Sequence, residues 1–252
     1  RTLAARDPGN TQWQRDLSVS HDKIGDMLAA TGDRSGALAA YGEGMEIART
    51  LAARDPGNTL WQRDLSVSHN NIGDMLAATG DGAGALTAYR EAMEIARTLA
   101  ARDPGNTQWQ RDLSVSHDKI GDMLAATGDR SGALAAYGEA MEIRRTLAAR
   151  DPGNTLWQRD LSVSHIKIGD MLAATGDGSG AFTAYGEGME IASTLAAHDP
   201  GNTRWQRELS ISHIKIGDML AATGDRSGAL TAYHEAMEIR RTLAARDPGN
   251  TE

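Results

Sequence analysis

The amino-acid sequence repeats itself every 48 residues, and this period constrains the fold more than any other feature. The phrase RTLAARDPGNT begins at residues 1, 49, 97, 145 and 241, and the variant STLAAHDPGNT begins at residue 193. The five Trp and the five Tyr residues recur at the same step, so the 252 residues hold five periods and twelve residues of a sixth. A fixed period of roughly 20 to 50 residues predicts an array of units, each burying its apolar face against its neighbours.

The first half of each period has the pattern of an amphipathic helix. In the first period, Thr-Gln-Trp-Gln at residues 11–14 has the form of a capping box, which predicts a helix start, and Gly32 predicts its end. Between these signals, residues of one helix face recur at steps of four and three: Trp13, Leu17, His21, Ile24 and Leu28. This spacing predicts a first helix at roughly residues 12–31.

The second half of each period predicts another helix. Asp33 provides an N-cap, and the turn residues Asp-Pro-Gly-Asn at 55–58 end the helix. The apolar face between them consists of Ala37, Tyr41, Met45, Ala48, Leu51 and Ala52. Small residues line the face between the two helices and let the backbones approach closely: Gly25, Ala29, Ala37, Ala40 and Gly44. Each period is therefore expected to form a helical hairpin.

These patterns predict an all-α fold, an α-solenoid of five helix-turn-helix repeats. We expect residues 1–252 to form a single solenoid. Full hairpins are expected at residues 11–54, 59–102, 107–150, 155–198 and 203–246, after a partial repeat at 1–10.

Composition narrows the classes of partner. No apolar run approaches the ~20 residues that span a bilayer. The net charge of −8, without a polybasic cluster, argues against nucleic acid and against an anionic membrane surface. The absence of Cys excludes disulfides and thiolate metal sites and agrees with a reducing, cytoplasmic location. With no signal-peptide pattern and no initiating Met, we expect a segment of a longer protein.

The motif at the centre of each period resembles the tetratricopeptide repeat. The residues that carry the resemblance are IGDMLAATGD at 24–33, followed by Ala37, Tyr41, Gly44, Met45 and Glu46. The family unit has about 34 residues, so the 48-residue unit is similar to long-helix variants such as those of kinesin light chain and of bacterial multidomain proteins. The resemblance implies a right-handed superhelix. It also implies a bacterial, non-catalytic scaffold that binds a protein or peptide in a concave groove.

Catalytic and metal sites are the alternatives to a binding scaffold. One His recurs in every period: His21, His69, His117, His165 and His213. The neighbouring Ser20 diverges from His21 by about 100° on a helix, and stacked hairpins separate equivalent His residues by about 10 Å, too far for one metal ion. We therefore expect these His residues to fill the buried side of the first helix. The Gly-containing loops before the second helix lack the features of a phosphate-binding loop. No catalytic residue, cofactor or metal is expected.

The open face of the first helix is the candidate binding surface. In the first period, residues at steps of four and three form a stripe: Arg15, Val19, Asp22, Asp26 and Ala29. The resemblance implies that this stripe lines the groove, although Asp replaces the Asn of the family's carboxylate clamp. The candidate residues are Arg15, Asp22, Asp26, Arg63, Asn70, Asp74, Arg111, Asp118, Asp122, Arg159, Ile166, Asp170, Arg207, Ile214 and Asp218. A second hypothesis is that the Asp and Arg columns, helped by Lys23, mainly pair with one another.

One stripe position changes character along the chain: Asp22, Asn70, Asp118, Ile166 and Ile214. We call these residues the position-22 series. The change from polar to apolar predicts a ligand with a basic stretch and an apolar stretch. The alternative function is a self-assembling structural module that stacks head to tail, with Leu3 of one copy against the last hairpin of the next.

Overall fold

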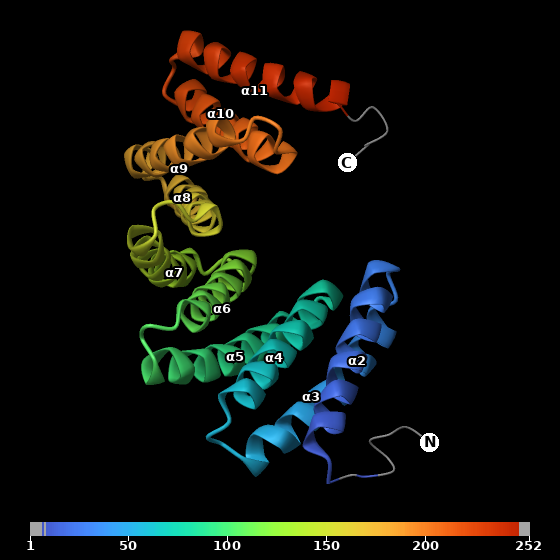
Figure 1. Ribbon diagram of the computed structural model, residues 1–252. Coiled ribbons are helices and arrows are strands. Elements are labelled where there is room, and N and C mark those ends of the chain that lie inside the picture. The colour runs from blue at the N-terminus through green and yellow to red at the C-terminus, as the bar shows by residue number, and fades with distance from the viewer. Residues whose placement is uncertain (1–6, 8, 247–252) are drawn as a thin grey trace. The chain divides into compact units, whose positions relative to one another are not determined.

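The computed structural model describes residue 7 and residues 9–246, and all regular secondary structure in this part of the chain is α-helical (Figure 1). The helices are α2 (Thr11–Ala30), α3 (Arg34–Arg54), α4 (Thr59–Thr79), α5 (Gly82–Arg102), α6 (Thr107–Ala126), α7 (Arg130–Arg150), α8 (Thr155–Thr175), α9 (Gly178–His198), α10 (Thr203–Ala222) and α11 (Arg226–Arg246). The expected all-α class, with two helices of about 20 residues in each period, is confirmed.

The chain divides into two units, Arg1–Asp129 with helices α2 to α6 and Arg130–Glu252 with helices α7 to α11. In the first unit α2 packs on α3, α3 on α4, α4 on α5 and α5 on α6. In the second unit each helix from α7 to α11 likewise packs on the next. The formation of one solenoid by all five hairpins stays a prediction. Of the partial repeat expected at 1–10, only residues 7, 9 and 10 lie within the described part.

The first helix of each hairpin begins one residue earlier than the capping box predicts. Asn10 has extended backbone angles, and its side chain accepts a hydrogen bond from the Trp13 backbone N–H at 3.1 Å. Asn10 is therefore the N-cap, and Thr11 is the first helical residue. The capping-box assignment was wrong because the short Asn side chain reaches the free N–H of the third helical residue. The same bond recurs in α4, α6, α8 and α10.

The turn inside the hairpin follows the prediction. Gly32 has a φ of +84°, a backbone conformation that a residue with a Cβ rarely adopts. Asp33 then caps α3, because its Oδ1 accepts a hydrogen bond from the Gly36 backbone N–H at 2.9 Å. Gly32 therefore ends the first helix and Asp33 begins the second, which accounts for the Gly-Asp pair in the turn.

Close packing of small residues around one tyrosine forms the centre of four hairpins, α2–α3, α4–α5, α8–α9 and α10–α11. Tyr41 is 5% exposed, and Ala37, Ala40 and Gly44 are buried beside it on α3. A Cβ placed on Gly25 of α2 would lie 2.5 Å from Tyr41 Cε1, so the ring rests directly on the glycine backbone. The seam that the sequence predicts is confirmed, except that Ala29 is only half-buried.

Two expectations about the apolar face need correction. Trp13 and Trp109 are half-buried rather than fully buried. Ile24 of α2 is 53% exposed, whereas the equivalent Ile120 of α6 is 7% exposed. This position is covered where a preceding second helix packs against it, as α5 packs on α6.

Candidate protein-binding surface

Four carboxylates of the Asp26 column receive a hydrogen bond from the central tyrosine of their hairpin. We define this column as Asp26, Asp74, Asp122, Asp170 and Asp218. The Tyr hydroxyl donates at 2.9 Å from Tyr41 to Asp26, 2.8 Å from Tyr89 to Asp74, 2.6 Å from Tyr185 to Asp170 and 2.8 Å from Tyr233 to Asp218. Burial, followed by the bond to Asp26, raises the pKa of Tyr41, so the phenol stays protonated and remains the donor.

Three of these carboxylates each bind a lysine as well. Lys119 Nζ donates to Asp74 Oδ1 at 2.5 Å across the boundary between two hairpins, and Lys215 makes the same bond to Asp170 at 2.6 Å. In α2, Lys23 bonds within its own helix to Asp26 at 3.0 Å, and this bond is the main cause that lowers the pKa of Asp26. These carboxylates are therefore partly neutralised by groups of the repeat itself.

The arginines of the stripe pair with a different set of acids. Arg15 Nε lies 2.6 Å from Asp64 Oδ2 on the next first helix. The same contact joins Arg63 to Asp112 at 2.5 Å and Arg159 to Glu208 at 2.7 Å. The hypothesis that the Arg column pairs with the Asp26 column is wrong for these three arginines. Their partners follow the next repeat's stripe arginine by one residue in the sequence, and the bonds link successive hairpins.

Two members of the position-22 series, Asp22 and Ile166, lie at the seam between the two helices of their hairpins. A Cβ placed on Gly44 would meet Asp22 Oδ1 at 3.1 Å, and one placed on Gly188 would meet Ile166 Cδ1 at 3.3 Å. Asp118 is 8% exposed, and the other four members are half-buried. Burial, followed by the charges of Asp26 and Asp64, raises the pKa of Asp22 to about 6. This series is thus less accessible than the sequence suggests.

The remaining stripe residues differ in exposure. Arg111 is half-buried, whereas Asp122 and Arg207 are exposed. Val19 and Val67 are each 39% exposed. Two equivalent valines therefore present apolar surface beside charged residues that are held in fixed positions.

Three of the recurring histidines, His21, His69 and His165, pair with glutamates that the sequence analysis missed. His69 Nδ1 lies 3.0 Å from Glu91 Oε2, and His165 Nδ1 lies 3.1 Å from Glu187 Oε2. Burial lowers the pKa of both His residues, although each glutamate acts in the opposite direction. The partner stands 22 residues away on the second helix, so only the constant spacing in every repeat could have indicated it.

The described residues contain neither a metal-binding cluster nor a membrane-spanning helix. Residue 7 and residues 9–246 contain no group of three or more His, Asp or Glu side chains placed to hold a metal ion. Among the described helices, none is long and apolar enough to cross a membrane.

The comparisons with known proteins agree with the repeat pattern. The family model of the tetratricopeptide repeat matches the chain at residues 68–104, 118–152 and 214–248. No curated protein matches the chain.

Solved structures with a similar fold include BtubC from P. vanneervenii, with a TM-score of 0.73 and 18% identity over 99% of this chain and 87% of that one. A Podosopora anserina protein with nearly identical TPR-like repeats has a TM-score of 0.57 and 14% identity over 91% of this chain and 97% of its own. The apo form of RapI has a TM-score of 0.57 and 11% identity over 91% of this chain and 85% of its own. These likenesses confirm the fold as a tetratricopeptide-like solenoid.

Proposed function

Because this chain carries tetratricopeptide repeats, we propose that it is a non-catalytic scaffold that binds a segment of a partner protein along the stripe of its first helices. The observation that carries the proposal is the combination of exposed valines with ordered charges on these helices. Val19 and Val67 offer apolar contact, and the carboxylates of Asp26 and Asp74 are held by their tyrosines. Side chains that are already ordered lose little conformational entropy on binding.

The partner segment is proposed to carry basic and apolar residues. The carboxylates of Asp26 and Asp218 are exposed, and they favour the approach of a basic segment. The valines supply surface whose burial slows dissociation.

A peptide selection tests the proposal. A phage library of random twelve-residue peptides is selected against the chain, and the enriched peptides are then measured against the Val19→Ser/Val67→Ser variant, which removes apolar surface without adding charge. Both valines are exposed, so the variant should fold normally while losing at least about tenfold in affinity. Reversing the charge of Asp74 is less suitable, because that carboxylate binds Tyr89 and Lys119 inside the fold.

The matched control is Phe182→Ser, which changes a side chain of α9, a second helix, that is 43% exposed. We expect this variant to keep full affinity. Equal losses in the two variants, or no enrichment of any peptide, would contradict the proposed surface.

Self-association is a second candidate, favoured by apolar exposure on α2 and α11. Ile24 and Met27 of α2 are 53% and 66% exposed, and Leu230 and Met237 of α11 are 58% and 49% exposed. The predicted contact of Leu3 lies outside the described residues. Sedimentation at rising concentration tests this candidate: association that Ile24→Lys/Met27→Lys abolishes supports it, and a monomer at millimolar concentration contradicts it.

A further inference from the structure

The fourth repeat lacks two arginines that every other full repeat contains. Ser193 stands where the other repeats have Arg49, Arg97, Arg145 and Arg241. His198 stands where they have Arg54, Arg102, Arg150 and Arg246. Both substitutions fall in the second half of α9, away from the first-helix stripe.

The first missing arginine leaves a carboxylate without its partner. In α3, α5 and α11 this arginine pairs with the glutamate three residues earlier: Arg49 with Glu46 at 2.7 Å, Arg97 with Glu94 at 3.0 Å and Arg241 with Glu238 at 3.7 Å. The equivalent residue in α9 is Glu190, which is exposed and makes no ion pair with any described residue.

The second missing arginine is the one that His198 replaces. In other repeats it donates a hydrogen bond from the end of the second helix to the turn before the first helix. Arg102 Nη1 donates to the Gly57 carbonyl at 2.9 Å, and Arg246 Nη1 donates to the Pro200 carbonyl at 3.0 Å. His198 is shorter and instead lies beside Trp205, with ring centroids 6.4 Å apart. The carbonyl at the turn before α8 therefore lacks its guanidinium donor.

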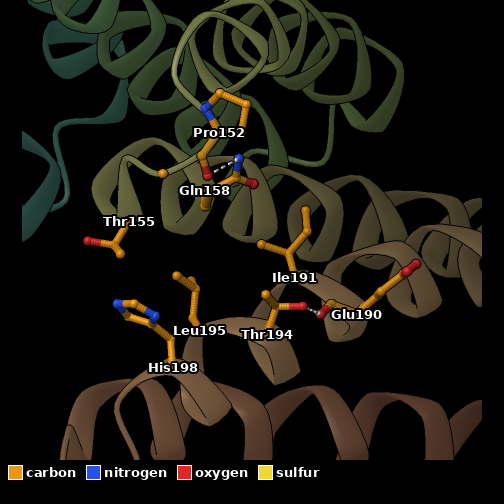
Figure 2. A pocket seen from close by; sticks show the side chains of 9 residues that line it. Pro152, Thr155, Gln158, Glu190, Ile191, Thr194, Leu195 and His198 are labelled. Atoms are coloured by element: carbon orange, nitrogen blue, oxygen red, sulfur yellow. Dashed lines mark hydrogen bonds between the residues drawn. The ribbon is translucent and has the colours of Figure 1, made fainter.

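In the fourth repeat a glutamine, Gln158, donates a hydrogen bond to a carbonyl of this turn. In three other repeats the equivalent glutamine donates to the end of the preceding helix: Gln62 to Ala52, Gln110 to Ala100 and Gln206 to Ala196. Gln158 donates to the Pro152 carbonyl at 3.3 Å instead (Figure 2). A carbonyl oxygen accepts two hydrogen bonds, so Pro152 keeps the capacity for a second donor.

A cavity of about 360 Å³ lies between the turn at 152–153, α8 and α9, and His198 is one of its lining residues. Ile191 and Leu195 provide its apolar surface, and Glu190 and His198 line it from α9 (Figure 2). The equivalent cavity of the fifth repeat measures about 270 Å³ and has Arg246 among its lining residues. Neither Lys nor Arg is among the described residues that line the cavity of the fourth repeat.

We propose that this cavity of the fourth repeat binds an arginine side chain of a partner protein. The aliphatic stem of the partner's arginine packs on Ile191 and Leu195. Its guanidinium takes the position beside the turn that Arg246 occupies in the fifth repeat. Glu190 supplies the complementary charge, and the Pro152 carbonyl is an acceptor at the turn. This site is separate from the stripe and does not depend on the proposed function.

Binding of N-acetyl-arginine amide tests the proposal, with N-acetyl-citrulline amide as the neutral isostere. The readout is the NMR shift of the His198 ring protons, which are assigned by their loss in His198→Arg. We expect a saturable shift with the arginine derivative and at least about tenfold weaker binding of the citrulline derivative, because a hydrogen bond to a charged group is stronger than one between neutral groups. Equal binding of the two compounds, or the absence of a saturable shift, would overturn the proposal.

The repeat itself supplies the control variants. Ser193→Arg/His198→Arg restores the residues of the other repeats, so it should fold and should abolish binding, followed by the backbone amide shifts of Leu195. The reciprocal variant Arg241→Ser/Arg246→His should create a second site in the fifth repeat, seen as a saturable shift of its new His ring. Binding that survives in the first variant, or no new site in the second, contradicts the assignment. None of these changes touches the stripe, so failure here is distinguishable from failure of the proposed function.

Discussion

Replacement of Asp22 should stabilise the chain, because its carboxylate is held at a helix seam that accepts an apolar side chain elsewhere. Asp22 lies against Gly44, and Ile166 lies against Gly188 in the same way in the fourth repeat. Asp22→Ile therefore reproduces a pair that the chain already contains. Asp22→Asn reproduces the residue of the second repeat and removes only the charge.

The size of the effect follows from the proton affinity of the carboxylate. The pKa of Asp22 rises from 3.8 to about 6, mainly because burial disfavours the charged form. At about 1.4 kcal/mol for each tenfold change in proton affinity, this rise corresponds to about 3 kcal/mol. Solvent screening of the half-buried group lowers the expected gain for Asp22→Asn to about 1–2 kcal/mol. Asp22→Ile adds about 1 kcal/mol of apolar burial.

The gain should depend on pH in a defined direction. The folded chain binds the Asp22 proton more tightly than the unfolded chain, so this group's contribution to stability is complete below pH 3.8 and is lost as the pH rises to about 6. Asp22→Asn and Asp22→Ile have no carboxylate at this position, so they do not lose this stability as the pH rises. The advantage of Asp22→Asn over the parent chain should therefore be complete above pH 6 and should disappear towards pH 4. Asp22→Ile should keep about 1 kcal/mol of its advantage at pH 4, because its apolar burial does not depend on pH.

Urea denaturation followed by circular dichroism measures this advantage as the difference in unfolding midpoint. Asp16→Asn, which neutralises an exposed carboxylate of the same helix, is the control and should change stability by less than about 0.5 kcal/mol. The reasoning is refuted by an Asp22→Asn variant that is no more stable than the parent at pH 8, or by an advantage that is equally large at pH 4.

Three further substitutions probe the hairpin seam by the same urea assay. Gly169→Ala should destabilise the fold by about 1–3 kcal/mol, because the added Cβ would lie 2.5 Å from Tyr185 Cε1; an unchanged midpoint would show that the ring moves freely. Tyr89→Phe should cost about 1 kcal/mol, since Asp74 loses one hydrogen bond but keeps its lysine; no loss would mean that water replaces the hydroxyl. Trp61→Ala should cost about 2 kcal/mol, below the usual range for a buried Trp because the side chain is half-buried, and a loss above about 4 kcal/mol would contradict that burial.

The hairpin was predictable from the sequence because its signals are local. The Gly32 stop, the Asp33 cap and the apolar face that includes Tyr41 lie within a few residues of the structure that they specify. The Asn10 cap was also available in the sequence, since Asn is a preferred N-cap, but the neighbouring Thr-x-x-Gln pattern competed with it.

The pairing of the stripe residues could not be predicted, because it joins residues far apart in the chain. Arg15 binds Asp64 and Lys119 binds Asp74, at separations of 49 and 45 residues. The Asp26 column and the stripe arginines recur side by side in the sequence, which suggests that they pair directly. In the folded chain Arg15 instead meets an acid of the next hairpin, and Asp74 meets a lysine of the next hairpin. The substitution at His198 was visible in the sequence, but its meaning depends on the cavity that it leaves.

Site-specific photo-crosslinking tests the central claim, that the stripe of the first helices binds a partner segment. A benzophenone amino acid is placed at Val67 on the stripe or at Phe182 on α9, both of which are exposed, and each chain is irradiated with a peptide enriched from the phage library. The account predicts a covalent adduct from position 67 and none from position 182. Crosslinking from position 182 alone, or from neither position at saturating peptide, would contradict it.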